Sequence, residues 1–189
     1  MIILASQSPR RREILSRLTE QFLVCPSDAD EHIPAAAPRD YVLALANKKA
    51  ASVALRYPRD VVVAADTIVV LDDAILGKPA DEREARAFLR ALSSRAHTVY
   101  TGVAVVKDGQ TRAFVEGTEV RFRALTEELI DFYVKTGEPM DKAGAYGIQG
   151  VGGRFVEGIT GDFFNVMGLP LCALSRVLEE MDVLDGEAE

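Results

Sequence analysis

The chain has 189 residues, a size that suits one domain or two small lobes around a shared core. Hydrophobic residues make up 48% of it, which is typical of a globular protein. The net charge of -7 argues against general nucleic-acid binding, and no apolar run approaches the ~20 residues of a membrane span, so we expect neither partner. The charges near the N-terminus follow the apolar residues, unlike those of a secretory signal. Cys25 and Cys172 are expected to be reduced core residues, which favours a cytoplasmic protein.

The first predicted elements are a short strand and a helix. Ile2 to Leu4 reads as a buried strand, and Ser6 or Ser8 can cap a helix whose first turn accommodates Pro9. The buried face of that helix consists of apolar residues at helical spacing, namely Ile14, Leu15 and Leu18.

Strand and helix patterns then alternate. A second strand is expected over Phe22 to Cys25, and after an acidic loop with several prolines a helix is expected over about Arg39 to Arg56. Two runs rich in β-branched residues, Val61 to Ala64 and Ile68 to Leu71, predict further strand structure. The "DDA" that follows them predicts a hairpin turn.

A helix and a second hairpin come next. Asp81 can cap a helix over about Glu82 to Leu92. His97 to Val106 and Arg112 to Phe122 predict two long strands joined by the turn signal "KDGQ". Thr126 then caps a helix that reaches about Lys135, with acidic residues near its positive end.

The last part of the chain differs in composition from the rest. A glycine-rich segment, "GAYGIQGVGGRFVEGITGDFF", precedes the amphipathic closing helix "LPLCALSRVLEEM". We expect residues 1–184 to form a single domain and residues 185–189 to be a frayed tail. Because strands and helices alternate with hairpins inserted, the predicted fold class is α/β on a mixed sheet.

Three consecutive arginines, Arg10 to Arg12, stand at the expected start of the first helix. Arginines at that end oppose the helix dipole, so Arg10 and Arg11 make best sense if an anion binds in front of them. Serine hydroxyls, free N–H groups and guanidinium groups together suit a phosphate. The alternative is that all three arginines are solvated or paired with acids.

Three other segments bear on this choice. Asp66 and Thr67 lie between two apolar strand runs, where a carboxylate is costly unless it is paired, hydrogen-bonded or metal-bound. Lys78 follows a predicted hairpin, and Gln149 lies among glycines that let backbone approach a ligand. Each has an ordinary alternative: a turn aspartate, a surface lysine, or a series of turns. The spacing of these residues excludes a Walker A loop and a Rossmann dinucleotide motif.

Taken in order, "LASQSPRRREIL", "DADE", "LANKKA", "AADTIVV", "LGKP", "DKAGAYGIQG" and "GDFFNVMGLPL" resemble the Maf family of nucleoside triphosphate pyrophosphatases. The resemblance implies hydrolysis of a nucleoside triphosphate to a monophosphate and pyrophosphate with a divalent cation, Mg²⁺ or Mn²⁺. It also implies a two-lobed fold shared with inosine triphosphate pyrophosphatases, with the nucleotide in the cleft between lobes, and a homodimer. Gln7 departs from the glycine that is common in the family.

The resemblance also assigns roles by position. Asp66 matches the proton acceptor, and Glu31 matches an acid near the metal or water, so both are candidate metal ligands. Whether Asp66 acts as a base or as a metal ligand stays open. The triphosphate-binding set comprises Ser6, Arg10, Arg11, Lys49 and Lys78.

Arg11, Thr67 and Gln149 match the branch of the family that resembles dTTP/UTP pyrophosphatases. Our hypothesis is that the Gln149 amide donates to one carbonyl of the pyrimidine and accepts from its N3–H. His32 and His97 are rival catalytic candidates that we do not favour. Two other interpretations are kept: a non-catalytic binding module that inhibits cell division or septum formation, and a nucleotide sensor without turnover.

Overall fold

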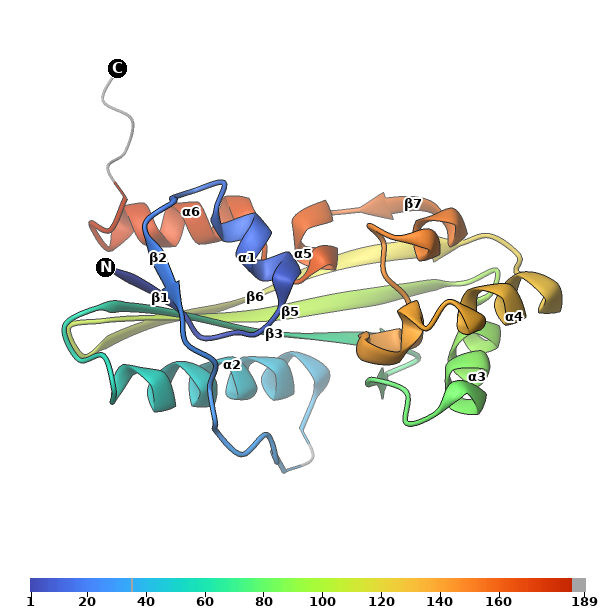
Figure 1. The fold of residues 1–189 in the computed structure, drawn as a ribbon, viewed down its shortest axis with the longest axis horizontal. Coiled ribbons are helices and arrows are strands. Elements are labelled where there is room, and N and C mark those ends of the chain that lie inside the picture. Colours follow the sequence, from blue (N-terminus) through green and yellow to red (C-terminus); the bar gives the residue numbers. More distant parts are fainter. Residues whose placement is uncertain (35, 185–189) are drawn as a thin grey trace, which may run out of the picture.

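The structure is a computed structural model that describes residues 1–34 and 36–184 (Figure 1). Its described part contains one seven-stranded sheet in the order β2-β1-β3-β5-β6-β7, with β4 paired to β3. β1 pairs in parallel with β2 and β3, and the other pairings are antiparallel, so the predicted mixed α/β sheet is confirmed. The strands are β1 Ile2–Leu4, β2 Phe22–Val24, β3 Val61–Leu71, β4 Ala74–Leu76, β5 Ala96–Lys107, β6 Gln110–Phe122 and β7 Val156–Thr160.

The described helices are α1 Pro9–Leu15, α2 Pro38–Ala54, α3 Glu82–Leu92, α4 Glu127–Lys135, α5 Phe163–Met167 and α6 Leu171–Glu180, with short 3₁₀ turns at Glu138–Asp141, Ala143–Ala145 and Val151–Phe155. Five of these six helices were predicted, whereas α5 and the 3₁₀ turns were not. Side chains cap four of these helices as N-cap residues are expected to do: Ser8, Asp81, Thr126 and Asp162.

Two predicted hairpin turns are confirmed. Asp72 and Asp73 between β3 and β4 have φ of 49° and 64°, and Asp108 and Gly109 between β5 and β6 have φ of 49° and 74°. Positive φ at both central residues is the requirement of the tight turn whose twist matches a hairpin. The two apolar runs around Asp66 belong to one continuous strand, β3.

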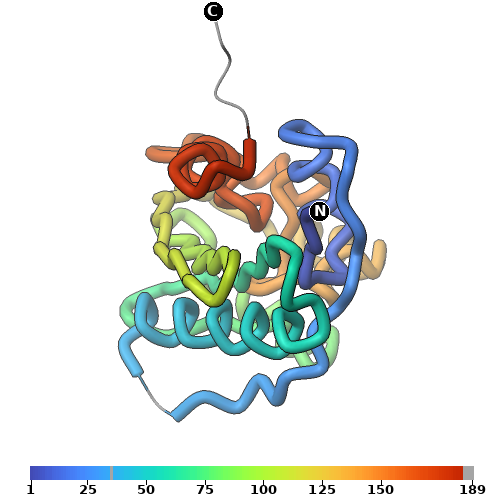
Figure 2. The backbone as a smooth tube through the Cα atoms, turned by 90° about the vertical axis from the view of Figure 1, so that its left-hand side faces the viewer, coloured from blue at the N-terminus to red at the C-terminus, as the bar shows by residue number. Residues whose placement is uncertain are grey.

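Helices cover both faces of the sheet at one end of the molecule. In Figure 1, α2 lies below the strands, and α1, α5 and α6 lie above them; Figure 2 shows α2 and α6 on opposite sides of the strands. Alternation along β1 explains both contacts, because Ile2 and Leu4 join the core under α1 and α6 while Ile3 joins the core under α2. A side chain at Gly102 would come within 2.6 Å of the Val42 carbonyl oxygen, so glycine lets α2 pack closely on β5.

The other end of the sheet forms a second lobe. There α3, α4 and the 3₁₀ turns lie together (Figure 1). They pack around a separate apolar core in which the Phe155 ring makes edge-on contacts with Phe122 and Tyr133. The two lobes share the long strands β3, β5 and β6.

One edge of β3 is divided between the lobes. β1 pairs with residues 61–63 of β3, and β4 pairs with residues 69–71. Between them, no described strand pairs with this edge. Because successive side chains of a strand point to opposite faces, Asp66 and Thr67 diverge from this open edge toward opposite sides of the sheet.

The expectation that both cysteines are core residues is wrong for Cys172, which is exposed. Cys25 is half-buried, and both thiols are free. Leu174 and Leu178 form the buried stripe of α6, and Cys172 lies two positions before Leu174, which places it on the opposite side of the helix. The predicted tail, residues 185–189, lies outside the described residues. None of the described helices is both long and apolar enough to span a membrane.

Candidate active site

A cleft of about 660 Å³ opens at the unpaired edge of β3. Its walls come from the β1–α1 loop, the start of α1, the loop before α2, α2 itself, β3, and the segment around residues 141–149. The structure brings every predicted site residue into its lining: Ser6, Arg10, Arg11, Glu31, Lys49, Asp66, Thr67, Lys78 and Gln149. Their chemical roles stay predictions, but their convergence in one cleft is a property of the fold.

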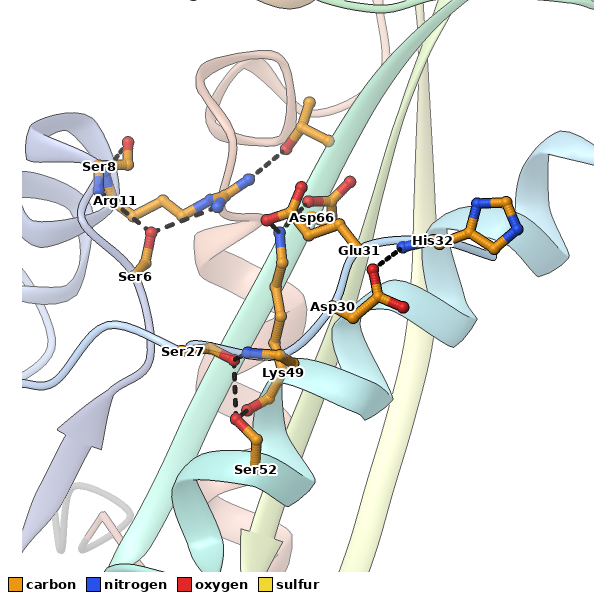
Figure 3. Close-up of polar contacts among 12 residues, drawn as sticks. Ser6, Ser8, Arg11, Ser27, Asp30, Glu31, His32, Lys49, Ser52 and Asp66 are labelled. Carbon is orange, nitrogen blue, oxygen red and sulfur yellow. Dashed lines mark hydrogen bonds and ion pairs between the residues drawn. The ribbon is translucent and has the colours of Figure 1, made fainter. Parts of the chain in front are cut away.

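Lys49 contacts two of the three acidic residues in the cleft lining, Asp66 and Glu31 (Figure 3). Its Nζ donates to Asp66 Oδ1 at 2.6 Å and lies 3.0 Å from Glu31 Oε1. Lys49 extends from α2 and Asp66 from β3, and their side chains are 12% and 15% exposed, whereas Glu31 is 67% exposed. Asp66 Oδ2 has no hydrogen bond to any described residue, so one carboxylate oxygen is available to a ligand or a water.

Arg11 is held in place by contacts with three different segments. Its Nε donates to the Gly168 carbonyl at 2.7 Å, Nη2 donates to Thr67 Oγ1 at 3.0 Å, and Nη1 donates to Ser6 Oγ at 3.3 Å. Burial lowers the pKa of Arg11, and the nearby Asp66 carboxylate opposes that shift. Three bonds leave two guanidinium N–H groups, so Arg11 can still donate into the cleft.

The three consecutive arginines do not all face the cleft. Arg10 and Arg11 line the cleft, whereas Arg12 is exposed and lies outside it. The Ser8 hydroxyl is already used as the helix cap, because it accepts from the Arg11 backbone N–H at 3.4 Å. This bond uses a lone pair of Ser8, and the Ser6 hydroxyl likewise accepts from Ser8 N and from Arg11 Nη1. Both hydroxyls therefore keep a proton that can be donated to a phosphate beside the guanidinium groups.

Lys78 and Gln149 lie at the exposed rim of the cleft. Within the described residues, Lys78 forms no ion pair, so its ammonium is available to an anion. Gln149 Nε2 donates to Glu13 Oε2 of α1 at 3.4 Å, which links the glycine-rich segment to α1. A contact between exposed groups of this kind is readily exchanged for a contact with a ligand.

The glycine-rich wall depends on Glu138, which sequence reasoning missed. Glu138 Oε1 accepts from the Tyr133 hydroxyl at 2.9 Å and from Gly152 N at 3.2 Å, and Oε2 accepts from Val151 N at 3.0 Å. The Tyr133 oxygen in turn accepts from Gly147 N at 3.1 Å. Burial opposes ionisation of Glu138, but the two backbone N–H donors prevail and lower its pKa.

Lys142 is a further basic residue of the cleft wall that sequence reasoning missed. Its Nζ donates to the Glu138 carbonyl and to Asp141 Oδ1, each at 2.7 Å. The "DK" ahead of the glycine-rich segment was the available signal, but a lysine beside an aspartate also describes an ordinary surface pair.

The two histidines lie outside the cleft lining. His97 is 3% exposed, its Nε2 lies 2.7 Å from the Tyr146 hydroxyl, and burial lowers its pKa to about 4. His32 is exposed in the loop before α2. Neither is placed to act on a ligand in the cleft.

The acids of the cleft fit a weakly held divalent cation. The described residues contain no cluster of three or more histidine, cysteine, aspartate or glutamate side chains that could hold a metal by themselves. Mg²⁺ is typically bound by one or two carboxylates together with phosphate oxygens and water. Asp66 and Glu31 already converge on one cation, the Lys49 ammonium, so this pair fits such an ion when a phosphorylated ligand supplies the other oxygens.

The fold is a mixed α/β sheet with a cleft at the divided edge of β3. Basic side chains and a partly buried carboxylate line this cleft, which is the kind of site that binds a phosphorylated ligand. The family model described as Maf-like protein matches residues 1–181. The chain belongs to this family.

Named relatives cover nearly the whole chain. It is 53% identical to a dTTP/UTP pyrophosphatase of Pyrococcus abyssi over 95% of each protein. It is 50% identical to a dTTP/UTP pyrophosphatase of Bacillus mycoides over 96% of this chain and 95% of that protein. Among solved structures, a nucleoside-triphosphatase / dITP/XTP pyrophosphatase of Mycobacterium abscessus aligns with 95% of this chain and 97% of that chain, at a TM-score of 0.44 and 15% identity.

Proposed function

We propose that this chain is a nucleoside triphosphate pyrophosphatase that hydrolyses dTTP and UTP to the monophosphate and pyrophosphate. The observation that carries the proposal is the convergence of Arg10, Arg11, Lys49, Lys78 and Asp66 on one cleft. The names of the relatives, which match over 95% of their length at about half identity, support the choice of pyrimidine substrates.

The cationic side chains bind and orient the triphosphate. Arg11 is fixed by contacts with three segments, so its remaining N–H groups are oriented before the ligand arrives. Preorganised donors of this kind stabilise the charge that develops on phosphate oxygens in the transition state. Lys78, at the open rim, adds a solvent-exposed positive charge.

Hydrolysis requires water to attack the α-phosphorus while pyrophosphate leaves. Asp66 offers a free carboxylate oxygen at the cleft, where it takes a proton from that water or shares in holding the cation. Asp66 and Glu31 would hold the divalent cation, and such an ion when bound neutralises phosphate charge and makes water more acidic. Lys49 keeps the Asp66 carboxylate in place through its 2.6 Å contact.

The cellular setting of this activity is part of the proposal. We expect a cytoplasmic enzyme that acts on the nucleotide pool and forms a homodimer, with no membrane or nucleic-acid partner. The negative net charge supports the expectation that nucleic acid is not a partner.

Pyrophosphate release from a panel of nucleoside triphosphates with Mg²⁺ or Mn²⁺ tests the proposal. We expect turnover of dTTP and UTP, and a loss of at least about 100-fold in Asp66→Asn, since general-base catalysis is typically worth ~10²–10⁴-fold. Asp73→Asn, a change of the same kind on the exposed β3–β4 turn, is the matched control and should leave turnover intact. Binding without product would indicate a nucleotide sensor, and neither binding nor product across the panel would favour the binding module that inhibits division.

A further inference from the structure

A chain of buried hydroxyl groups runs from the cleft into the protein behind Arg11. Arg11 Nη2 donates to Thr67 Oγ1 at 3.0 Å, and Thr67 Oγ1 lies 2.9 Å from Thr101 Oγ1. Thr101 Oγ1 in turn lies 3.0 Å from the backbone carbonyl oxygen of Asn165. Thr101 and Asn165 are both 0% exposed, so only Thr67 reaches the cleft.

The groups at the two ends of this series of hydrogen bonds, the Asn165 carbonyl and the Arg11 guanidinium, fix which atom donates in each bond. A backbone carbonyl can only accept, so the single Thr101 proton is committed to Asn165. Thr101 Oγ1 must then accept from Thr67, which commits the Thr67 proton as well. A guanidinium group can only donate, so one Thr67 lone pair is occupied by Arg11.

What remains of the Thr67 hydroxyl is a single lone pair. Toward the cleft, Thr67 is therefore a hydrogen-bond acceptor that cannot become a donor while Thr101 takes its proton. Arg11, beside it, presents N–H donors. Uracil and thymine carry a donor, N3–H, between two carbonyl acceptors, whereas the N3 atom of cytosine is itself an acceptor.

We propose that Thr101 is a positioning residue for base selection, because it makes Thr67 an obligatory acceptor that pairs with N3–H of uracil or thymine and opposes N3 of cytosine. The inference rests on the proposed function and deepens it. It revises one part of the hypothesis for Gln149: Thr67 accepts from N3–H, and the Gln149 amide is left to donate to a base carbonyl. Thr101 itself never touches the substrate.

The test is the ratio of kcat/KM for CTP to that for UTP in Thr101→Val. Valine keeps the branched shape of a buried strand residue and removes the acceptor, so the Thr67 proton is free to turn toward the cleft. We expect the ratio to rise by about tenfold or more, the effect of one hydrogen bond between a matched and an opposed base. An unchanged ratio overturns the proposal.

Two control variants separate base selection from loss of structure. Thr101→Ser retains the hydroxyl and should retain the wild-type ratio. Thr118→Val removes another buried hydroxyl, which contacts Asn165 Nδ2 at 3.0 Å and the Asp162 carbonyl at 2.9 Å but not Thr67. It should lower stability and leave the ratio unchanged; an equal rise in Thr118→Val would show a general loosening and overturn the proposal.

A substrate change tests the acceptor role of Thr67, on which the proposal depends, even if Thr101→Val does not fold. Wild-type enzyme should turn over UTP at least about tenfold better, in kcat/KM, than UTP methylated at N3, which has lost the donor. Equal turnover of the two would contradict the acceptor role of Thr67. If wild-type enzyme hydrolyses UTP but these ratios do not move, the inference alone fails; if it hydrolyses no nucleotide, the proposed function fails.

Discussion

Glu138→Gln is expected to loosen the glycine-rich wall of the cleft. In the wild-type protein, the two carboxylate oxygens of Glu138 accept from Tyr133 Oη, Val151 N and Gly152 N at 2.9–3.2 Å. Glutamine has the same shape but only one acceptor oxygen, and its NH₂ group must then face at least one of these donors. The contacts between Glu138 and the wall fix the backbone next to Gln149.

The expected cost follows from the number of bonds. Hydrogen bonds to a charged acceptor contribute about 1.5–3 kcal/mol each, and an unsatisfied buried donor costs about 1–3 kcal/mol. Glu138 is only half-buried, so we take the lower part of that range and expect a loss of about 2–4 kcal/mol in the free energy of unfolding. The ordinary surface substitution stays within about 0.5 kcal/mol.

Urea unfolding measures the loss of stability, and hydrogen exchange measures the loosening of the glycine-rich wall. Glu138→Gln should unfold at lower urea, and the amides of residues 147–152 should exchange faster than in wild type. Glu157→Gln is the matched control, because Glu157 lies on β7 with half of its side chain exposed and only a 3.6 Å contact to Arg121.

The effect of Glu138 should also depend on pH. The pKa of Glu138 is lowered in the folded state, so its contribution to the free energy of unfolding is present above the unfolded pKa and is lost as pH falls through the folded pKa. The gap between wild type and Glu138→Gln should therefore narrow in acid. If Glu138→Gln matches Glu157→Gln in both assays, Glu138 does not anchor the wall.

Three further outcomes are expected. Gln149→Glu replaces the amide donor with a carboxylate and should lower kcat/KM for UTP by about tenfold or more, without an equal loss for other triphosphates; unchanged selectivity in the nucleotide panel would refute a role at the base. Burial lowers the pKa of His97 from 6.5 to about 4, so the unfolded chain binds more protons between these values, and wild type should lose roughly 3 kcal/mol of unfolding free energy as pH falls from 6.5 to 4. His97→Gln should remove most of that slope in urea titrations, and equal slopes would contradict the burial of a neutral imidazole. Chelation with EDTA should abolish pyrophosphate release, and added Mg²⁺ or Mn²⁺ should restore it; full activity in excess chelator would exclude the cation from the reaction.

Local signals in the sequence accounted for most elements of the fold. The serine, threonine and aspartate caps, the two hairpin turns and the apolar periodicity depend on residues close together in the chain, so they can be read without a structure. The orientation of Cys172 could not be read in this way, because an apolar neighbourhood in sequence does not say which side of α6 faces the core.

The cleft was accessible to sequence reasoning for a different reason. Arg10, Arg11 and Asp66 looked unusual in their local setting. Glu31 and Lys49 were named only through the resemblance to a family, which joined all of these residues into one site. Glu138 was not accessible, because the groups that it holds include backbone N–H groups 13 and 14 residues further along the chain, which carry no side-chain signature. The commitment of the Thr67 proton likewise depends on Asn165, which lies nearly 100 residues away in sequence and comes close only because α5 packs on β5.

The most direct measurement follows the oxygen of water into the products. With UTP, a divalent cation and ¹⁸O-labelled water, mass spectrometry should find one labelled oxygen in UMP and none in pyrophosphate, because in the proposed reaction water attacks the α-phosphorus between the arginines and Asp66. Label in pyrophosphate, or release of orthophosphate in place of pyrophosphate, would contradict this chemistry.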